Sequence, residues 1–261
     1  MSNSKAKRGQ ATDEERSFHD DYFEGKRSPT NRLESWILSL YPEMPDPTDR
    51  ILRALGQVRG KRICEIGCGR GKLTRELAAR GAHVSASDIS AEAVRLARKT
   101  AEDFIPEQVD VQEMDASNLL YNDNSFDLLV GISILHHVDI DKVSQGINRV
   151  LKPGGKAVFI EPLAHNPISN MGRRLTPSSR TPHEWPLSYS EIQRMGKQFS
   201  SVKCQEYALL TLLSSFVYLV THSHKAKRKS AELLARLEPA FLKIFGPLRR
   251  YSGAVLIEFT K

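Results

Sequence analysis

Short apolar runs alternate with stretches of helical periodicity along most of the chain. We predict strands at residues 62–64, 83–88, 109–114, 126–132, 156–160, 202–207 and 254–259. The run at 126–132 is nearly continuous in apolar residues, which suits a strand buried on both faces. Strands that alternate with helices along the chain predict an α/β fold with a mostly parallel sheet.

Helical periodicity also precedes the first predicted strand. We expect a first helix at residues 13–24 and a second at 31–40, and Thr48 is a candidate N-cap for a third. Residues 1–12 are polar and charged, and we expect them to be flexible. These helices at 13–47 either pack on the core or form a lid over a ligand.

A glycine-rich turn at residues 65–71 follows the first predicted strand. Its glycines alternate with other residues, at Gly67, Gly69 and Gly71. Because glycine has no Cβ, such a loop adopts positive φ and lets a ligand approach the backbone, and the helix that follows offers free N–H groups. The third glycine comes two positions after the second, whereas the dinucleotide fingerprint places it three after. The acidic Glu65 favours a ligand with a positive group over a pyrophosphate.

Acidic residues end the next two predicted strands. Asp88 follows Gly67 by 21 residues, where a βαβ unit places a carboxylate that accepts hydrogen bonds from ribose hydroxyls. Asp115 and Ala116 follow the third strand, where a carboxylate can meet an adenine amino group. Either acid alone also fits a helix N-cap. Two of them at successive strand ends after a glycine loop predict a nucleoside site.

Residues 51–162 resemble the class I S-adenosylmethionine-dependent methyltransferases, in particular the type 11 small-molecule group. Besides the glycine loop and the two acids, the resemblance rests on Phe-Asp at 126–127, Leu-His-His-Val at 135–138 and Leu-Lys-Pro-Gly-Gly at 151–155. It implies S-adenosylmethionine as the cofactor. It also implies a Rossmann-like, mostly parallel seven-stranded sheet with helices on both faces, in which the last strand inserts antiparallel near the edge.

The resemblance further implies which side chains hold the cofactor. The glycine loop is expected at its amino-acid end, Asp88 at its ribose, and Ser133 beside its methionine part. An aromatic residue of the first helix, Tyr22 or Phe23, either closes over the cofactor or packs on the core. The predicted cofactor-binding residues are Glu65, Gly67, Gly69, Gly71, Asp88, Ile89, Asp115, Ala116, Ser133 and Tyr22.

Methyl transfer from a sulfonium is an in-line displacement, so the protein mainly orients the acceptor and excludes water. A base is needed only where the acceptor atom carries a proton of high pKa. The candidates are His136, His137 and His165, with Glu161 nearby, because imidazole titrates near neutrality. The adjacent histidines equally fit a structural role in which one ring packs or bonds to backbone.

The chain departs from the common pattern after the fifth strand. Segments at about 163–187 and 208–250 are expected to form helical caps inserted in a methyltransferase domain of residues 48–261, with a helix capped by Ser190 between them. The first cap is rich in Arg, Pro, Ser and Thr. Its predicted substrate-binding residues are Arg173, Arg174 and Arg180, which either grip a carboxylate or phosphate by forked hydrogen bonds or tie the loop to acids of the main domain.

The net charge of +7 is concentrated in the C-terminal third, where residues 170–261 carry 15 basic and six acidic side chains. An apolar stretch at 208–220 precedes a lysine-rich run, and it is too short for a bilayer span, which needs about 20 residues. It fits either a buried cap over an apolar substrate pocket or a peripheral membrane contact through 208–229.

Three cysteines with no disulfide-like spacing and a polar N-terminus without a secretory signal predict a cytoplasmic protein, or one peripheral at the inner membrane surface. The cysteines and histidines show no metal-binding spacing, so no metal is expected.

These patterns predict methyl transfer to a small, amphiphilic or apolar acceptor, with O- or N-methylation favoured over C-methylation. RNA methylation is one alternative, suggested by the basic C-terminal third. It is disfavoured because Ser-Ile-Leu-His stands at 133–136 in place of an Asn/Asp-Pro-Pro-Tyr/Phe motif. A different reaction of the same cofactor on the same fold is a second alternative.

Overall fold

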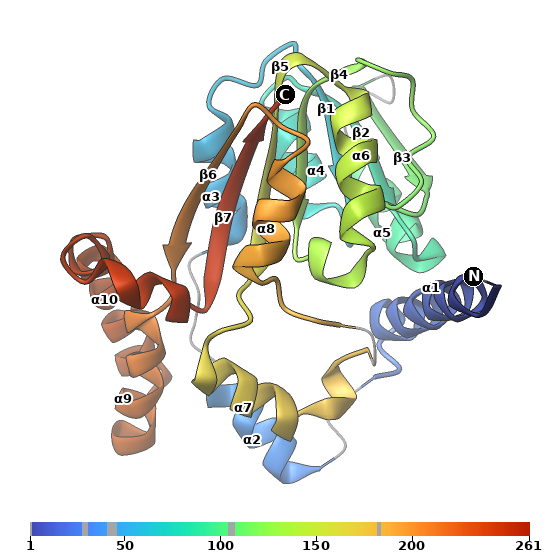
Figure 1. Ribbon diagram of the computed structural model, residues 1–261. Helices are drawn as coiled ribbons and strands as arrows, with labels where there is room; N and C mark the ends of the chain where they lie inside the picture. The colour runs from blue at the N-terminus through green and yellow to red at the C-terminus, as the bar shows by residue number, and fades with distance from the viewer. Residues whose placement is uncertain (1, 28–30, 41–45, 104–107, 182–183) are drawn as a thin grey trace.

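The computed structural model describes residues 2–27, 31–40, 46–103, 108–181 and 184–261 (Figure 1). A single seven-stranded sheet has the strand order β3-β2-β1-β4-β5-β7-β6. The strands are β1 (Arg62–Ile66), β2 (His83–Asp88), β3 (Val109–Glu113), β4 (Phe126–Ile132), β5 (Leu151–Pro162), β6 (Ser201–Tyr207) and β7 (Ala254–Thr260). β1 to β5 are parallel, and β7 inserts antiparallel between β5 and β6. The predicted fold class is confirmed.

Helices cover both faces of the sheet. α3 (Pro47–Leu55), α4 (Lys72–Ala79) and α5 (Ala91–Ala101) contribute to one apolar cluster, and α6 (Ile140–Val150) and α8 (Tyr189–Gly196) contribute to the other. Successive strand residues divide between the clusters, as Leu128 and Leu129 do, because side chains alternate across a strand. The central strands are therefore buried on both faces.

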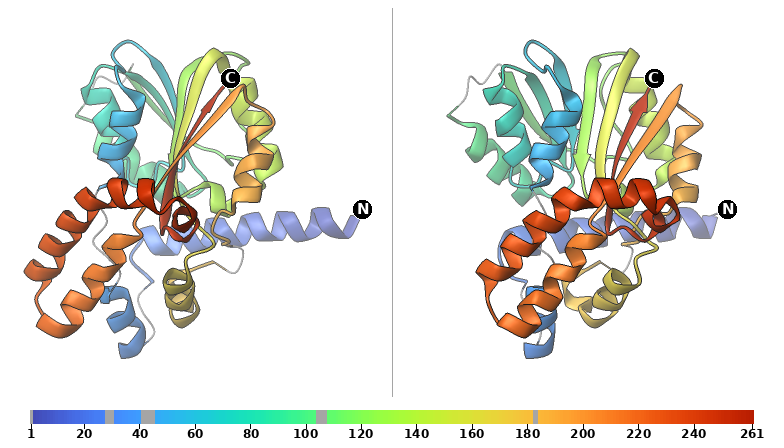
Figure 2. Two further views of the ribbon diagram at one scale, coloured as in Figure 1. Left: turned by 60° about the vertical axis from the view of Figure 1, so that its left-hand side comes forward. Right: turned by 90° about the vertical axis from the view of Figure 1, so that its left-hand side faces the viewer.

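The remaining helices gather beyond the carboxyl edge of the parallel strands (Figures 1 and 2). They are α1 (Ser2–Phe23), α2 (Arg32–Leu40), α7 (Pro167–Leu175), α9 (Ser214–Thr221) and α10 (His224–Ile244), with 3-10 turns at Leu135–His137, Pro177–Ser179, Leu210–Leu213 and Gly246–Tyr251. α9 and α10 form a hairpin that projects from the sheet. No helix of the described residues has the length and apolar character needed to cross a membrane.

α1 is fixed by polar contacts to the loop between β2 and α5. Asp20 accepts a hydrogen bond from the Ser90 hydroxyl at 2.5 Å, at the start of α5, and Arg16 Nε donates to the Ile89 carbonyl at 3.3 Å. The helix begins at Ser2, within the segment expected to be flexible, and α10 begins at His224, so it takes in the lysine-rich run. The division into a lid, a main domain and caps stays a prediction.

Two predicted caps are wrong by two residues each. Asp46, not Thr48, caps α3, because its side chain accepts from the Thr48 N–H. Ser188, not Ser190, caps α8 in a capping box with Glu191. In both cases another capping residue lies two positions earlier, and the sequence alone does not rank the two. The Leu-Lys-Pro-Gly-Gly motif at 151–155 belongs to β5, with Gly154 at φ 75°.

Candidate active site

A cavity of about 530 Å³ lies at the carboxyl edge of the sheet, between the strand ends and α1. It combines segments that are far apart in sequence: the glycine loop, the ends of β2, β3 and β4, and one face of α1. Of the predicted site residues, it is lined by Gly67, Gly69, Asp88, Ile89, Asp115, Ala116, Ser133 and His137. The structure therefore brings most of the predicted cofactor residues together.

The three glycines have different roles. Gly67 and Gly69 line the cavity with φ of 69° and 52°, and a Cβ on Gly67 would lie 3.1 Å from the Ile134 side chain. Gly71 instead begins α4, where a Cβ would lie 2.9 Å from the backbone of Ala97 in α5. Two glycines thus expose backbone to the cavity, and the third permits close packing of two helices.

Asp88 ties the glycine loop to the end of β2. Its carboxylate accepts from the Gly69 N–H at 2.9 Å and from the Ser90 N–H at 3.0 Å. Burial raises the pKa of Asp88, and these backbone donors oppose the rise. Asp115 accepts from the Ser117 N–H at 2.7 Å in the same way. Both carboxylates are held by local backbone at the cavity wall.

Glu65 lies in the core below the loop. It is 3% exposed, and the Thr74 hydroxyl donates to Oε2 at 2.6 Å. Burial raises the pKa of Glu65 to about 8, against the opposing effect of the Thr74 hydrogen bond. Burial therefore favours the neutral form of this carboxyl and opposes the negative charge that the sequence suggested at this place.

The aromatic residue at the cavity is Phe23. Tyr22, the predicted residue, is 55% exposed, whereas its neighbour Phe23 lines the cavity and lies 3.5 Å from the position of a Cβ on Gly69. On a helix, adjacent residues point about 100° apart, so an error of one position changes the face.

A second cavity of about 220 Å³ adjoins the first, since Ile132 and Ser133 line both. Most of its wall is apolar, and Glu161 and Arg173 provide charged groups. Ser133 has a φ of 55° and donates its N–H to the Ile160 carbonyl at 2.8 Å, which places it between the two spaces. The geometry suits one ligand in each cavity with Ser133 between them.

The three candidate histidines have different surroundings. His136 is buried, with Nδ1 2.7 Å from Glu161 Oε2, and the other oxygen of Glu161 accepts from the N–H groups of Ile134 and Leu135. His165 is exposed, with its ring 6.0 Å from that of Tyr189. His137 lines the larger cavity.

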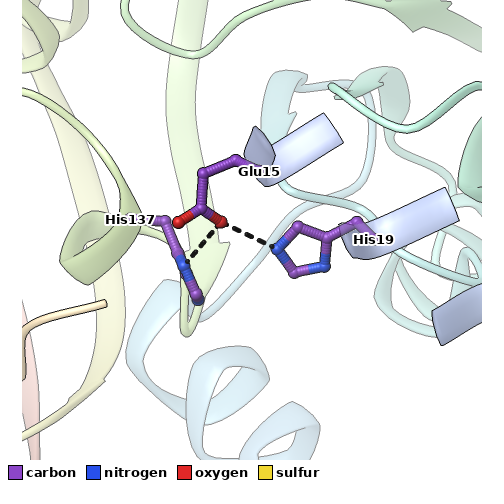
Figure 3. Close-up of side chains that lie close together, drawn as sticks. All are labelled: Glu15, His19 and His137. Carbon is purple, nitrogen blue, oxygen red and sulfur yellow. Dashed lines mark ion pairs between the residues drawn. The ribbon is translucent and has the colours of Figure 1, made fainter. Parts of the chain in front are cut away.

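Two residues of α1 complete the surroundings of His137. Figure 3 shows Glu15 and His19 projecting from α1 toward it: Glu15 Oε2 lies 3.2 Å from His137 Nδ1 and 3.5 Å from His19 Nε2. Burial alone would raise the pKa of Glu15, but its interactions with His137, His19 and Thr181 lower it to about 2. Sequence reasoning missed both residues, although Glu15, His19 and Phe23 share one helical face through their spacing of four.

The three arginines predicted to bind substrate lie in different surroundings. Arg173 lines the second cavity, and its Nη1 donates to Asn170 Oδ1 at 2.9 Å. Arg180 pairs with Glu184 at 2.6 Å, and Arg174 is exposed. The structure thus brings only Arg173 of the three to a cavity wall.

Comparison with known proteins agrees with this arrangement. Residues 64–159 match a family model described as a methyltransferase domain. The ubiquinone biosynthesis O-methyltransferase of Aeromonas salmonicida is 30% identical over 175 residues, which cover 63% of this chain and 73% of that protein. The chain belongs to the class I S-adenosylmethionine-dependent methyltransferases. It is accordingly an enzyme of methyl transfer to small molecules, with S-adenosylmethionine as its cofactor.

Other similar proteins vary in how much they share with this methyltransferase. The demethylmenaquinone methyltransferase of Clavibacter sepedonicus is 34% identical over 110 residues, with 42% of this chain and 44% of that protein covered. Phosphoethanolamine N-methyltransferase 2 of Haemonchus contortus has a TM-score of 0.62 at 19% identity, and the match covers 94% of this chain and 59% of the other. The [4+2]-cyclase SpnF has a TM-score of 0.57 at 21% identity, over 82% of this chain and 80% of the other. The two structural likenesses show the fold.

Proposed function

We propose that this methyltransferase binds S-adenosylmethionine in the larger cavity and a small, partly apolar acceptor in the smaller one. The observation that carries the proposal is the pair of adjoining cavities that share Ile132 and Ser133, one with several charged and polar groups in its wall and one almost wholly apolar. When bound, S-adenosylmethionine supplies a methyl group on a sulfonium. The chain positions two molecules and excludes water between them.

The larger cavity fits this cofactor in size and in chemistry. Its volume lies within the range of about 300–1,000 Å³ typical of ligand sites. The bare backbone at Gly67 and Gly69 suits the amino-acid end, Asp88 the ribose, and Asp115, Ala116 and Ile89 the adenine. We assign Phe23 the closing role predicted for Tyr22. Glu65 and Gly71 support the loop from within the protein.

We propose His137 as the base for an acceptor that carries a proton. It lines the larger cavity, so the reacting atom of the acceptor has to reach past Ser133 into that cavity to meet it. The Glu15 carboxylate beside Nδ1 favours the tautomer with its proton there. Nε2 is then free to accept a proton from the acceptor. Glu161 holds His136 in place through Nδ1, and His165 is exposed, so both fit the role less well. O- and N-methylation are favoured because they use such a base, and C-methylation is the remaining option.

The smaller cavity favours an amphiphilic acceptor. Tyr207, Leu212 and Ala254 give it apolar walls, and Arg173 can bind an acidic group at one side. Similar proteins are named for ubiquinone biosynthesis and for demethylmenaquinone, whose quinones join apolar chains to polar groups. A small acceptor of this type fits the cavities better than RNA does.

We further propose peripheral contact with an anionic inner membrane surface through residues 208–229. Phe216 and Val220 of α9 are 56% and 82% exposed, and the exposed Lys225 and Lys229 of α10 lie next to them in sequence. Apolar side chains beside lysines are typical of interfacial elements. Such a position gives access to an acceptor that is dissolved in lipid.

Binding of S-adenosylmethionine and S-adenosylhomocysteine by calorimetry tests the central proposal. Wild type is expected to bind both, and Asp88→Ala to bind at least about 100-fold more weakly, because it loses the ribose contact and the anchor of the loop. Ser85→Ala, on the same strand away from the cavity, is the matched control. Equal affinity in wild type and Asp88→Ala would place the cofactor elsewhere. After binding is established, a screen of amphiphilic phenols, amines and acids identifies the acceptor.

A further inference from the structure

We propose that Glu15, His19 and His137 form a binding site for a divalent transition-metal ion such as Zn²⁺, which links α1 to the loop after β4. The three side chains come from two elements more than 100 residues apart and meet at the wall of the larger cavity (Figure 3). Two imidazoles and one carboxylate are a ligand set typical of zinc and of other first-row transition metals.

The distances between the ligand atoms fit a tetrahedral ion. Bonds of about 2.0–2.1 Å place neighbouring ligands of tetrahedral zinc about 3.3 Å apart. Glu15 Oε2 lies 3.2 Å from His137 Nδ1 and 3.5 Å from His19 Nε2, and all three atoms lie within 4.8 Å of one another. The third distance joins His19 Nε2 to His137 Nδ1. The His19 side chain is 25% exposed, so its ring has room to move toward His137 and shorten that distance. The fourth position would face the cavity.

Two of the three ligand atoms make no hydrogen bond and could therefore bind a metal ion. Among the described residues, Glu15 Oε2 and His137 Nδ1 are buried and neither has a hydrogen-bond partner, although the two form an ion pair. The Glu15 side chain is only 7% exposed. Buried polar atoms normally have partners, and orphaned ones call for an explanation such as an ion. The other oxygen of Glu15 accepts from the Thr181 hydroxyl, which orients the carboxylate as an outer-shell partner would.

His137 also belongs to a second group, with His136 and Glu184. That group is less suited to an ion because its members have other partners. Glu184 pairs with Arg180 at 2.6 Å, and His136 Nδ1 is bound to Glu161 at 2.7 Å. A nearby guanidinium also opposes a second positive charge. The group with Glu15 and His19 is therefore the better site.

Metal binding would prevent His137 from acting as a base. A metal bound at Nδ1 takes the lone pair of that nitrogen, so the single proton of the neutral ring has to be carried on Nε2 instead. Nε2 then has no lone pair to accept the acceptor's proton. If the proposed role of His137 is correct, zinc will inhibit methyl transfer. The metal site itself does not depend on that role.

The test uses the full chain, freed of metal with a chelator and titrated with Zn²⁺ by calorimetry. Wild type is expected to bind one equivalent, and His19→Ala and Glu15→Gln to bind at least about 10-fold more weakly. His83→Ala removes an exposed histidine at the opposite end of the sheet, and it is expected to bind like wild type. With Co²⁺ in place of zinc, wild type should show the visible absorption of a tetrahedral site, and His19→Ala should lose it.

Equal zinc affinity in wild type and His19→Ala would overturn the proposal, as would a loss of affinity in His83→Ala as large as that in His19→Ala. Circular dichroism and urea unfolding show that each variant is folded, since Glu15 and His19 line the cofactor cavity and cofactor binding alone would not show it. Binding of S-adenosylhomocysteine by wild type separates the two proposals, because cofactor binding and metal binding are read in different titrations. A chain that binds cofactor and no metal refutes only the metal site.

Discussion

The strand ends and α1 form opposite walls of the same cavity, but they are built in different ways. At the strand ends, Asp88 and Asp115 accept hydrogen bonds from backbone N–H groups that lie close to them in sequence. Each has a donor two residues away, and Asp88 has a second donor 19 residues away. On α1, Glu15 and His19 meet His137 only through tertiary contact, and Asp20 fixes the helix to α5. One wall is set by local sequence and the other by packing. Substitutions on the two walls should therefore differ in what they change.

The largest expected effect is on chemistry, where the two walls meet. His137→Ala should lower kcat by about 100- to 10,000-fold for an acceptor that carries a proton, because a positioned base contributes that much. His165→Ala should leave kcat within about twofold, since that ring is exposed. Cofactor affinity measured by calorimetry should change far less than kcat in His137→Ala, whose ring lines the cofactor cavity, and should stay unchanged in His165→Ala. Normal turnover in His137→Ala with strongly reduced turnover in His165→Ala would reverse the assignment.

The same contrast explains what the sequence could predict. The alternation of apolar runs with helices, the glycine turn and the acids after β2 and β3 are local signals, and the structure confirms the sheet and brings Gly67, Gly69, Asp88 and Asp115 to one cavity. No local pattern marks Glu15 as a partner of His137, because the two lie 122 positions apart and meet only after α1 docks. The wall whose contacts are close in sequence can therefore be predicted from the chain, and the wall made by α1 cannot.

There is also a physical reason why the sequence does not decide between two candidate residues that lie one or two positions apart. Tyr22 and Phe23 carry the same hydrophobic signal, and so do Ser188 and Ser190 as caps. Which residue of each pair faces the cavity or begins the helix depends on the docked rotation of α1 and on where the chain turns into α8. Hydrophobic periodicity and capping preference place a residue only to within one or two positions, so they cannot distinguish the members of these pairs.

A smaller expected effect concerns the core below the strand ends. Burial raises the pKa of Glu65 to about 8 in the folded protein, from an ordinary value of 4.5. Between these two pH values the folded state holds a proton that the unfolded state releases, so stability falls as pH rises through the window. Glu65→Gln should remove this dependence, and at pH 8 to 9 it should be more stable than wild type by about 2 kcal/mol or more.

Urea unfolding from pH 5 to 9 measures the difference between the two proteins. Glu76→Gln, which changes a half-buried carboxyl on α4 that pairs with Arg80, is the control and should keep the wild-type slope. Parallel curves for wild type and Glu65→Gln would mean that Glu65 is ionised in the folded state. Its charge would then be available to a positively charged ligand, as the sequence first suggested.

The smallest expected effect tests α1 alone. Phe23→Ala removes a ring that lines the cavity beside Gly69, and it should weaken S-adenosylhomocysteine binding by about 3- to 10-fold, the equivalent of about 0.5–1.5 kcal/mol for an aromatic contact. Tyr22→Ala removes the exposed neighbouring ring and should change affinity by less than about twofold. Because the two substitutions are adjacent and of similar size, they affect the helix alike and differ in the face that they alter. A larger loss in Tyr22→Ala would mean that α1 binds the cofactor in a rotation different from the one described, and the contacts of Glu15 and His19 would then change with it.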